Sequence, residues 1–185
     1  MLRVERKEAL ELNAIQGFKG IAYDGNWFYL TVENESKIIK YDVCFNQIGS
    51  FETDTCYTYI CYDSIDDCFW ATDREDSSCI YKLNESFELL AKLSISIPDA
   101  LGRKINGISH NYISDKLFIS FSNVIVSMDK HSLNDCNILY RSGNKRIHGV
   151  TDIFSSYICY GISRSKQEIH ISCLCGNLIK RIHIP

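Results

Sequence analysis

Short apolar segments separated by polar turns run along the chain from residue 17 onward. In "GIAYDGNWFYLTVENESKIIKYD", apolar and aromatic residues form short runs, and Asp, Gly, Asn and Ser fill the gaps between them. Such runs, rich in β-branched and aromatic residues, are typical of β-strands. No apolar face with helical spacing persists in any segment, which argues against a helical bundle. The pattern therefore predicts an all-β fold.

The same succession of strands recurs four times. Ile21, Ile60, Ile108 and Val150 occupy matching positions in the first strand of each unit, at a spacing of about 40 residues. Each unit continues with an aromatic-rich second strand, an alternating third strand and a partly charged fourth strand. A repeat of four short strands is typical of a β-propeller blade, whereas the strands of an immunoglobulin-like sandwich do not repeat in sets of four.

These units predict a single β-propeller domain of four blades, each a four-stranded antiparallel sheet. The expected blades cover residues 16–53, 57–97, 104–142 and 147–185, after an N-terminal extension at 1–15. The large aromatic residues of the second strands are expected to pack between blades. They are Trp27, Phe28, Phe69 and Trp70.

The segments "GIAYDGNWFYLTV" and "SKIIKYD" resemble the NHL, YVTN and SMP-30/gluconolactonase group of β-propeller repeats. The resemblance covers Gly17 to Ile184 and rests on a degenerate pattern of apolar positions. The third strands lack the Trp-Asp of WD40 repeats, and the second strands lack the Gly-Gly pair of kelch repeats. Members of the resembled group usually have six or more blades. Three arrangements therefore stay open: a closed four-bladed monomer, two chains that complete an eight-bladed ring, and a fragment of a larger propeller.

The resemblance also implies an alternative function, that of a metal-dependent lactonase or hydrolase. Enzymes of that group hold a metal near the channel with a carboxylate, an Asn and an Asp. Here the first unit lacks an "E-G-P" opening, and Asn34, Asn106 and Asn123 do not fall into a matching order. The chain also lacks a G-x-S-x-G elbow, an H-E-x-x-H motif and a glycine-rich phosphate loop. We therefore assign no catalytic residue, metal ligand or cofactor, and enzymatic activity stays undecided.

Candidate ligand-binding residues fall in loops that a propeller brings to one face, around the mouth of its channel. The predicted set is Lys19, Asn34, Arg74, Arg103, Arg146, His148 and Arg164. Arg74 and Arg164 follow the second strand at matching places. A guanidinium group suits carboxylate or phosphate because its donors form a fixed fork. The alternative is that these are solvated charges paired with neighbouring acids.

Aspartates occupy the loops expected on the opposite face, among them Asp24, Asp63, Asp115 and Asp129. Their spacing differs from that of a calcium-binding loop, so turn capping is their expected role. Cys173-x-Cys175 has a spacing that suits a soft metal ion. No second pair accompanies it, and buried thiols are the better interpretation.

Composition and net charge limit the classes of partner that we expect. The 185 residues carry a net charge of -3, which gives no general attraction to nucleic acid or to a membrane surface. No apolar run approaches the ~20 residues of a membrane span, and the N-terminus lacks the apolar region of a signal peptide. Nine cysteines, an odd number in apolar surroundings, indicate free thiols in a reducing compartment. We expect a cytoplasmic, non-enzymatic binding or protein-interaction module for a protein or small anionic ligand, as a monomer or homodimer.

Overall fold

The computed structural model describes residues 17–95, 104–143, 146–153, 157–163, 168–173 and 178–183. All regular elements in these ranges are β-strands, and they pair in antiparallel sheets of four. The prediction of an all-β fold made of four-stranded antiparallel sheets is therefore confirmed. Within the described ranges, there is no helix with the length and apolarity needed to cross a bilayer.

The strands follow one another in chain order within each sheet. The first sheet consists of β1 (Phe18–Tyr23), β2 (Phe28–Val32), β3 (Lys37–Tyr41) and β4 (Gln47–Glu52). The second consists of β5 (Tyr57–Asp63), β6 (Cys68–Asp73), β7 (Cys79–Leu83) and β8 (Leu89–Ser94). The third consists of β9 (Gly107–Asn111), β10 (Lys116–Ser120), β11 (Val124–Asp129) and β12 (Cys136–Arg141). The fourth consists of β13 (Arg146–Ile153), β14 (Tyr157–Ser163), β15 (Glu168–Cys173) and β16 (Leu178–His183).

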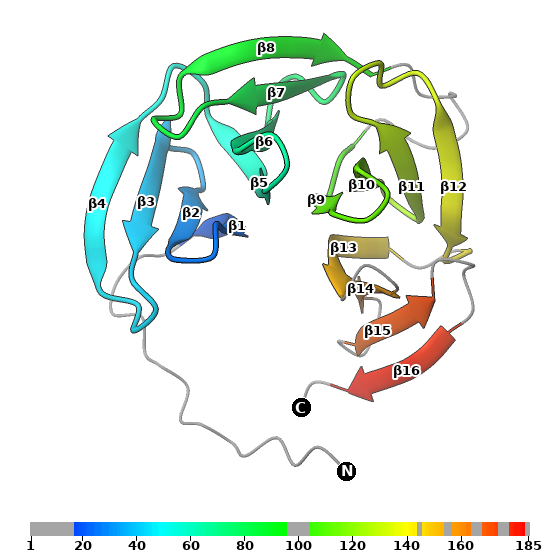
Figure 1. Ribbon diagram of the computed structural model, residues 1–185. Helices are drawn as coiled ribbons and strands as arrows, with labels where there is room; N and C mark the ends of the chain where they lie inside the picture. The colour runs from blue at the N-terminus through cyan, green and yellow to red at the C-terminus, as the bar shows by residue number, and fades with distance from the viewer. Residues whose placement is uncertain are drawn as a thin grey trace.

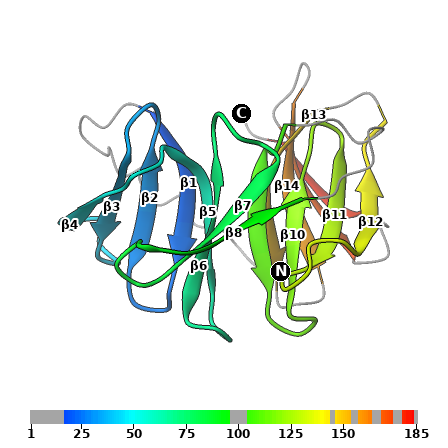
Figure 2. The ribbon, with the colours of Figure 1, turned by 90° about the horizontal axis from the view of Figure 1, so that it is seen from above.

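The sheets stand around a common centre in a propeller-like arrangement (Figure 1). The first strand of each sheet lies innermost, and the last strand lies at the rim. Neighbouring sheets contact each other through the inner strands: β1 with β5, β5 with β9, and β9 with β13. In the view from above, the strands run between two faces on which the turns gather (Figure 2). Loops from different sheets are thereby brought to the same face.

Side-chain alternation along each strand builds the core between the sheets. In β2, Tyr29 joins a buried cluster shared with Ile60 and Phe69 of the second sheet, while Leu30 joins a cluster on the other face of the first sheet. A second inter-sheet cluster joins Trp70 to Leu117 and other residues of the third sheet. Successive side chains of a strand point to opposite faces, so each aromatic-rich second strand can supply both sides of its sheet.

Two glycines permit the close approach of the inner strands. A Cβ atom at Gly20 would lie 2.8 Å from the Thr58 carbonyl oxygen of β5. A Cβ atom at Gly107 would lie 2.6 Å from the Cα atom of Gly149 in β13. Both contacts involve backbone atoms, so any larger residue would push two sheets apart.

Asp and Asn side chains cap equivalent turns in successive sheets. After the first strand, Asp24 Oδ1 accepts the N–H groups of Asn26 and Trp27, and Asp63 Oδ1 accepts those of Ile65 and Asp66. After the third strand, caps of the same kind come from Asp42, Asn84 and Asp129. The turn-capping role expected for Asp24, Asp63 and Asp129 is therefore confirmed.

The expected packing of strand aromatics holds for two residues and is wrong for Trp27. Phe69 and Trp70 are almost fully buried. Trp27 precedes β2, belongs to the capped turn, and is 36% exposed. The ammonium of Lys40 lies 5.0 Å from its ring centroid. Phe28 is half-buried and stacks on Phe45, in the cluster on the outer face of the first sheet.

Candidate functional site

A pocket of about 200 Å³ opens where β5 begins. We call it the cation pocket. Its lining comes from the first sheet, the second sheet and the segment before β9: Lys19, Val32, Glu33, Asn34, Cys56, Tyr57, Thr58, Tyr59, Asp73, Arg74, Ser77, Lys104 and Ile105. The turns after β2 and β6 reach this site because both strands run toward the same face.

Three cations border the cation pocket, and their pairing differs. Lys19 Nζ lies 3.0 Å from Glu33 Oε1. Arg74 and Lys104 are exposed, and neither has a carboxylate within ion-pairing distance among the described residues. The neighbouring Asp73 is engaged elsewhere: it accepts the Glu75 N–H at 2.9 Å and the Tyr81 hydroxyl at 3.3 Å. The pocket therefore offers two cationic groups that no described carboxylate neutralises.

Neutral groups complete the cation pocket. Asn34 is exposed and has a φ of 65°, a left-handed conformation that Asn tolerates better than most residues. Tyr57 is buried, and Tyr59 is half-buried. Burial raises the pKa of both phenols, so they stay protonated at neutral pH. The pocket combines three cations, the carboxylates of Glu33 and Asp73, an amide and two tyrosines.

The structure brings together three of the seven predicted ligand-binding residues. Lys19, Asn34 and Arg74 all line the cation pocket. His148 lines a second cavity, at the centre of the sheets, and Arg146 is an exposed residue at the start of β13. Burial and the Arg146 charge lower the pKa of His148, which favours a neutral imidazole. Arg103 and Arg164 lie outside the described residues, as does Cys175.

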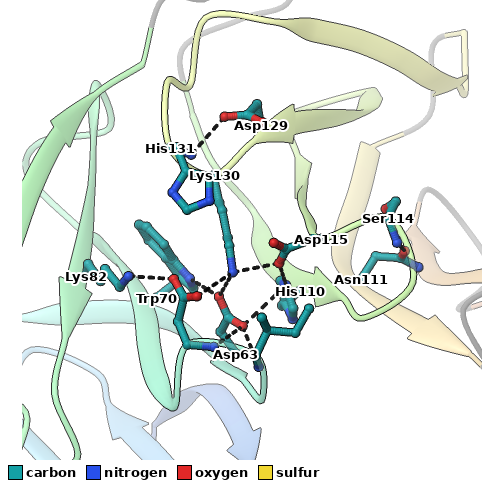
Figure 3. Close-up of polar contacts among 12 residues, drawn as sticks. Asp63, Trp70, Lys82, His110, Asn111, Ser114, Asp115, Asp129, Lys130 and His131 are labelled. Carbon is teal, nitrogen blue, oxygen red and sulfur yellow. Dashed lines mark hydrogen bonds and ion pairs between the residues drawn. The ribbon is translucent and has the colours of Figure 1, made fainter.

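The opposite end of β5 holds a cluster of charged side chains around Lys130 (Figure 3). Both Lys130 and Asp63 have fully buried side chains. Lys130 Nζ lies 2.9 Å from Asp63 Oδ2, 3.1 Å from Asp66 Oδ1 and 2.6 Å from Asp115 Oδ1. One ammonium thus joins the turns of the second and third sheets. We call this group of residues the Lys130 cluster.

Hydrogen bonds occupy most of the remaining oxygens of the Lys130 cluster. The Trp70 indole donates to Asp63 Oδ2 at 3.1 Å, and Lys82 Nζ donates to Asp66 Oδ2 at 2.6 Å. His110 Nε2 lies 3.0 Å from Asp115 Oδ1. The carboxylates of the cluster are therefore held by cations and hydrogen-bond donors that the chain itself supplies.

These contacts set the pKa values in the Lys130 cluster. Burial alone would raise the pKa of Asp63, but hydrogen bonds from Lys130 and Trp70 hold it below its usual value. Lys82, with Lys130, lowers the pKa of Asp66 to about 2. Burial opposes the charge of Lys130, yet its carboxylate partners raise its pKa. Asp63, Asp66 and Lys130 are therefore charged at neutral pH.

The Lys130 cluster contains residue types that can bind a metal ion, but the Lys130 ammonium already lies among them. Asp63, His110 and Asp115 place one donor atom each within 4.8 Å of one another, and so do Asp63, Asp66 and Cys68. Lys130 Nζ contacts the carboxylates of both groups. Burial raises the pKa of the Cys68 thiol to about 12, whereas metal binding needs a thiolate. The Lys130 ammonium takes the role that an ion would have here.

The Lys130 cluster did not emerge from the sequence. Asp63 and Lys130 are 67 residues apart, and Lys130 follows an ordinary strand, "VIVSMD", at a turn. A buried lysine in such a turn has no local signature. The expected role of turn cap is incomplete for Asp115, whose carboxylate pairs with Lys130 and His110.

Comparisons with known proteins bear on the fold of the chain and not on the chemistry of its candidate site. No protein-family model matches the chain, and no curated protein matches it. A chain in the crystal structure of the nidogen/laminin complex superposes with a TM-score of 0.63 at 16% identity, over 90% of this chain and 64% of that chain. Hydrazine synthase of Kuenenia stuttgartiensis gives 0.63 at 9% identity, over 100% and 53%. Glutaminyl cyclase of Myxococcus xanthus gives 0.62 at 11% identity, over 91% and 74%.

These likenesses support a propeller-type fold and, at such identities, the fold alone. The chain spans less than two thirds of the length of the first two of these structures. The narrower resemblance to NHL, YVTN and SMP-30 repeats has no family match behind it.

Proposed function

We propose that the protein is a non-enzymatic binding module, a four-bladed propeller that holds the carboxylate of a small ligand in the cation pocket. The observation that supports this function most directly is the convergence of Arg74 and Lys104 on one pocket without a described carboxylate partner. If neighbouring carboxylates already paired with these cations, an anionic ligand would gain little free energy by binding to them. Two cations without such partners attract an anion from water.

The functional groups that line the cation pocket favour a carboxylate as the ligand. Arg74 offers a planar fork of donors that matches the two oxygens of a carboxylate. Lys104 adds a second charge, and the Asn34 amide adds neutral donors. Tyr57 and Tyr59 also line the pocket, beside cations that are exposed to water.

A titration with small ions tests this function. Sodium acetate, inorganic phosphate and methylammonium chloride are added to the full chain at constant ionic strength and followed by two-dimensional NMR. We expect acetate to give saturable shifts at the amides of Thr58 and Tyr59, while methylammonium gives none. Arg74→Ala should weaken acetate binding by about tenfold, the lower range for a lost charge-assisted hydrogen bond.

Two matched variants accompany the titration. Arg74→Lys keeps the charge without the fork and should recover part of the affinity. Lys180→Ala removes an exposed cation from β16 at the rim and should change nothing. Absence of saturable shifts with either anion would contradict the proposed function.

The alternative of a metal-dependent lactonase or hydrolase has weaker support. The described clusters with suitable ligand types share Lys130 as their cation. A metal bound there would have to displace an ammonium that three carboxylates hold. The binding function needs no such rearrangement.

A further inference from the structure

A second cavity, of about 350 Å³, lies at the centre of the sheets. The innermost strands of all four sheets line it, with Ile21 from β1, Ile60 from β5, Ile108 from β9 and Val150 from β13. We call it the channel cavity. Lys19 and Tyr59 also line the cation pocket, so the two spaces adjoin.

The channel cavity has an apolar wall. Ile60, Ile108 and Val150 line it from three strands, although they are only 2%, 5% and 8% exposed and belong to the clusters between the sheets. Ile21 completes the wall and leaves 55% of its surface exposed. A β-branched aliphatic side chain that faces a cavity beside other aliphatic groups is stabilised when an apolar ligand group covers it.

Polar side chains also line the channel cavity, namely those of Lys19, Tyr59, Asn106 and His148. The Asn106 amide is buried and donates to the Ile147 carbonyl at 3.1 Å. Lys19 lies on the side that adjoins the cation pocket and pairs there with Glu33. A ligand with an anionic head and an apolar tail matches this order of surfaces: cations first, aliphatic wall beyond.

We propose that the ligand is an amphipathic monocarboxylate whose aliphatic chain occupies the channel cavity while its carboxylate binds Arg74 and Lys104. This inference rests on the proposed function and adds the chemical class of the ligand. A volume of about 350 Å³ is at the small end of ligand cavities, which suits a chain on the order of four to eight carbons.

A homologous series tests the ligand class. Acetate, butanoate, hexanoate and octanoate are titrated into the full chain at pH 7 and constant ionic strength, with hexylammonium chloride as a ligand of opposite charge. Affinity should rise about three- to fourfold with each added methylene until the cavity is filled. Hexylammonium should bind far more weakly than hexanoate, because its charge is repelled by the cation pocket.

Two variants test whether the aliphatic chain of the ligand occupies the channel cavity. Ile21→Ser should flatten the dependence on chain length and leave the affinity for acetate unchanged. Ile65→Ser removes a similarly exposed isoleucine, 46% exposed, from the turn at the other end of β5 and should leave the dependence intact. Thermal unfolding of both variants checks that each remains folded, and a conservative Ile21→Val exchange, with an intermediate slope expected, serves if Ile21→Ser unfolds.

Each outcome separates this inference from the proposed function. Acetate binding without any gain along the series would overturn the amphipathic ligand and leave the carboxylate site standing. An unchanged chain-length dependence in Ile21→Ser would overturn the channel cavity as the place of the tail. If no carboxylate of any length binds, both proposals fail. Equal affinity for hexylammonium and hexanoate would overturn the assignment of the head group.

Discussion

The charged groups at the two ends of β5 differ in burial and in ion pairing. At its carboxyl end, the Asp63 carboxylate is fully buried and contacts the ammonium of Lys130. At its amino end, Tyr57 and Tyr59 border a pocket in which Arg74 and Lys104 have no carboxylate partner among the described residues. Six residues of extended chain, about 20 Å, separate the two. Both regions lie where turns from neighbouring sheets meet.

This difference distinguishes a structural cluster from a binding site. In the Lys130 cluster, three carboxylates and two lysines satisfy one another, so a ligand would have to break existing bonds to enter. In the cation pocket, no described carboxylate pairs with Arg74 or Lys104. Burial and complete pairing favour a role in joining sheets, whereas exposure and missing partners favour a role in binding. The following predictions test this division.

Removal of the central ammonium should have the largest effect on stability. Lys130→Met keeps most of the length of the side chain and leaves Asp63 and its neighbours without their shared counterion. We expect a loss of about 3–5 kcal/mol in the free energy of unfolding, as for other broken buried ion pairs, measured by urea denaturation. Lys82→Met is the matched control: Lys82 is partly exposed and contacts Asp66, so its loss should cost about 1 kcal/mol. A loss below about 1 kcal/mol for Lys130→Met would contradict the structural role.

Acid should destabilise the protein through the same carboxylates. The pKa values of Asp63, Asp66 and Asp115 are lowered in the folded state, that of Asp66 to about 2. A lowered pKa gives stability that is fully present above the unfolded value of about 4 and is lost as pH falls through the folded value. We therefore expect unfolding free energy to drop between about pH 5 and pH 2.

The Lys130→Met variant isolates the contribution of the Lys130 cluster to this acid dependence. Without the ammonium, the three carboxylates lose the interaction that lowers their pKa values, so the free energy of unfolding should fall less steeply with acid. Urea denaturation of both proteins at several pH values compares the slopes. Equal slopes would show that capping aspartates elsewhere, such as Asp42 and Asp129, carry the effect.

Neutralising one carboxylate of the Lys130 cluster should have an intermediate effect. Asp115 has a φ of 51°, which Asn also adopts, so Asp115→Asn removes charge without straining the backbone. We expect a loss of about 1–2 kcal/mol, because the bonds to Lys130 and His110 lose their ionic partner. Asp67→Asn is the control, since Asp67 has a φ of 50° and is exposed. Equal losses for the two variants would refute a specific role for Asp115.

Local sequence patterns accounted for the strands and turns but not for the Lys130 cluster. Alternation and aromatic content predicted the four-stranded sheets, because a strand's side chains must match the faces that it separates. The phase of the repeat also placed Lys19, Asn34 and Arg74 at one face, and these three line one pocket, although Lys19 lies within β1 and not in a loop. Those inferences use neighbours in sequence, which is where periodic patterns are informative.

Long-range pairing could not be predicted in the same way. The contact of Lys130 with Asp63 depends on how the third sheet packs against the second, and no sequence spacing encodes that distance. That no described carboxylate pairs with Arg74 likewise depends on Asp73 bonding Glu75 and Tyr81 instead. Trp27 differs for a local reason: its N–H group bonds the Asp24 cap, which keeps the residue in the turn and outside the strand.

The smallest expected change in stability comes from an exchange in the cation pocket. Glu33→Gln removes the carboxylate that pairs with Lys19 at 3.0 Å, a pair in which both side chains are more than one third exposed. Such exposed pairs contribute little, so the free energy of unfolding should change by less than about 0.5 kcal/mol. The released Lys19 charge should instead strengthen acetate binding about two- to fivefold, and this gain should shrink as salt is added.

Glu52→Gln makes the same change in net charge at an exposed site, where the partner Lys37 is 3.9 Å away. A rise in affinity confined to Glu33→Gln attributes the effect to pairing inside the pocket. An equal rise in both variants would attribute it to net charge and remove the distinction between the two ends of β5.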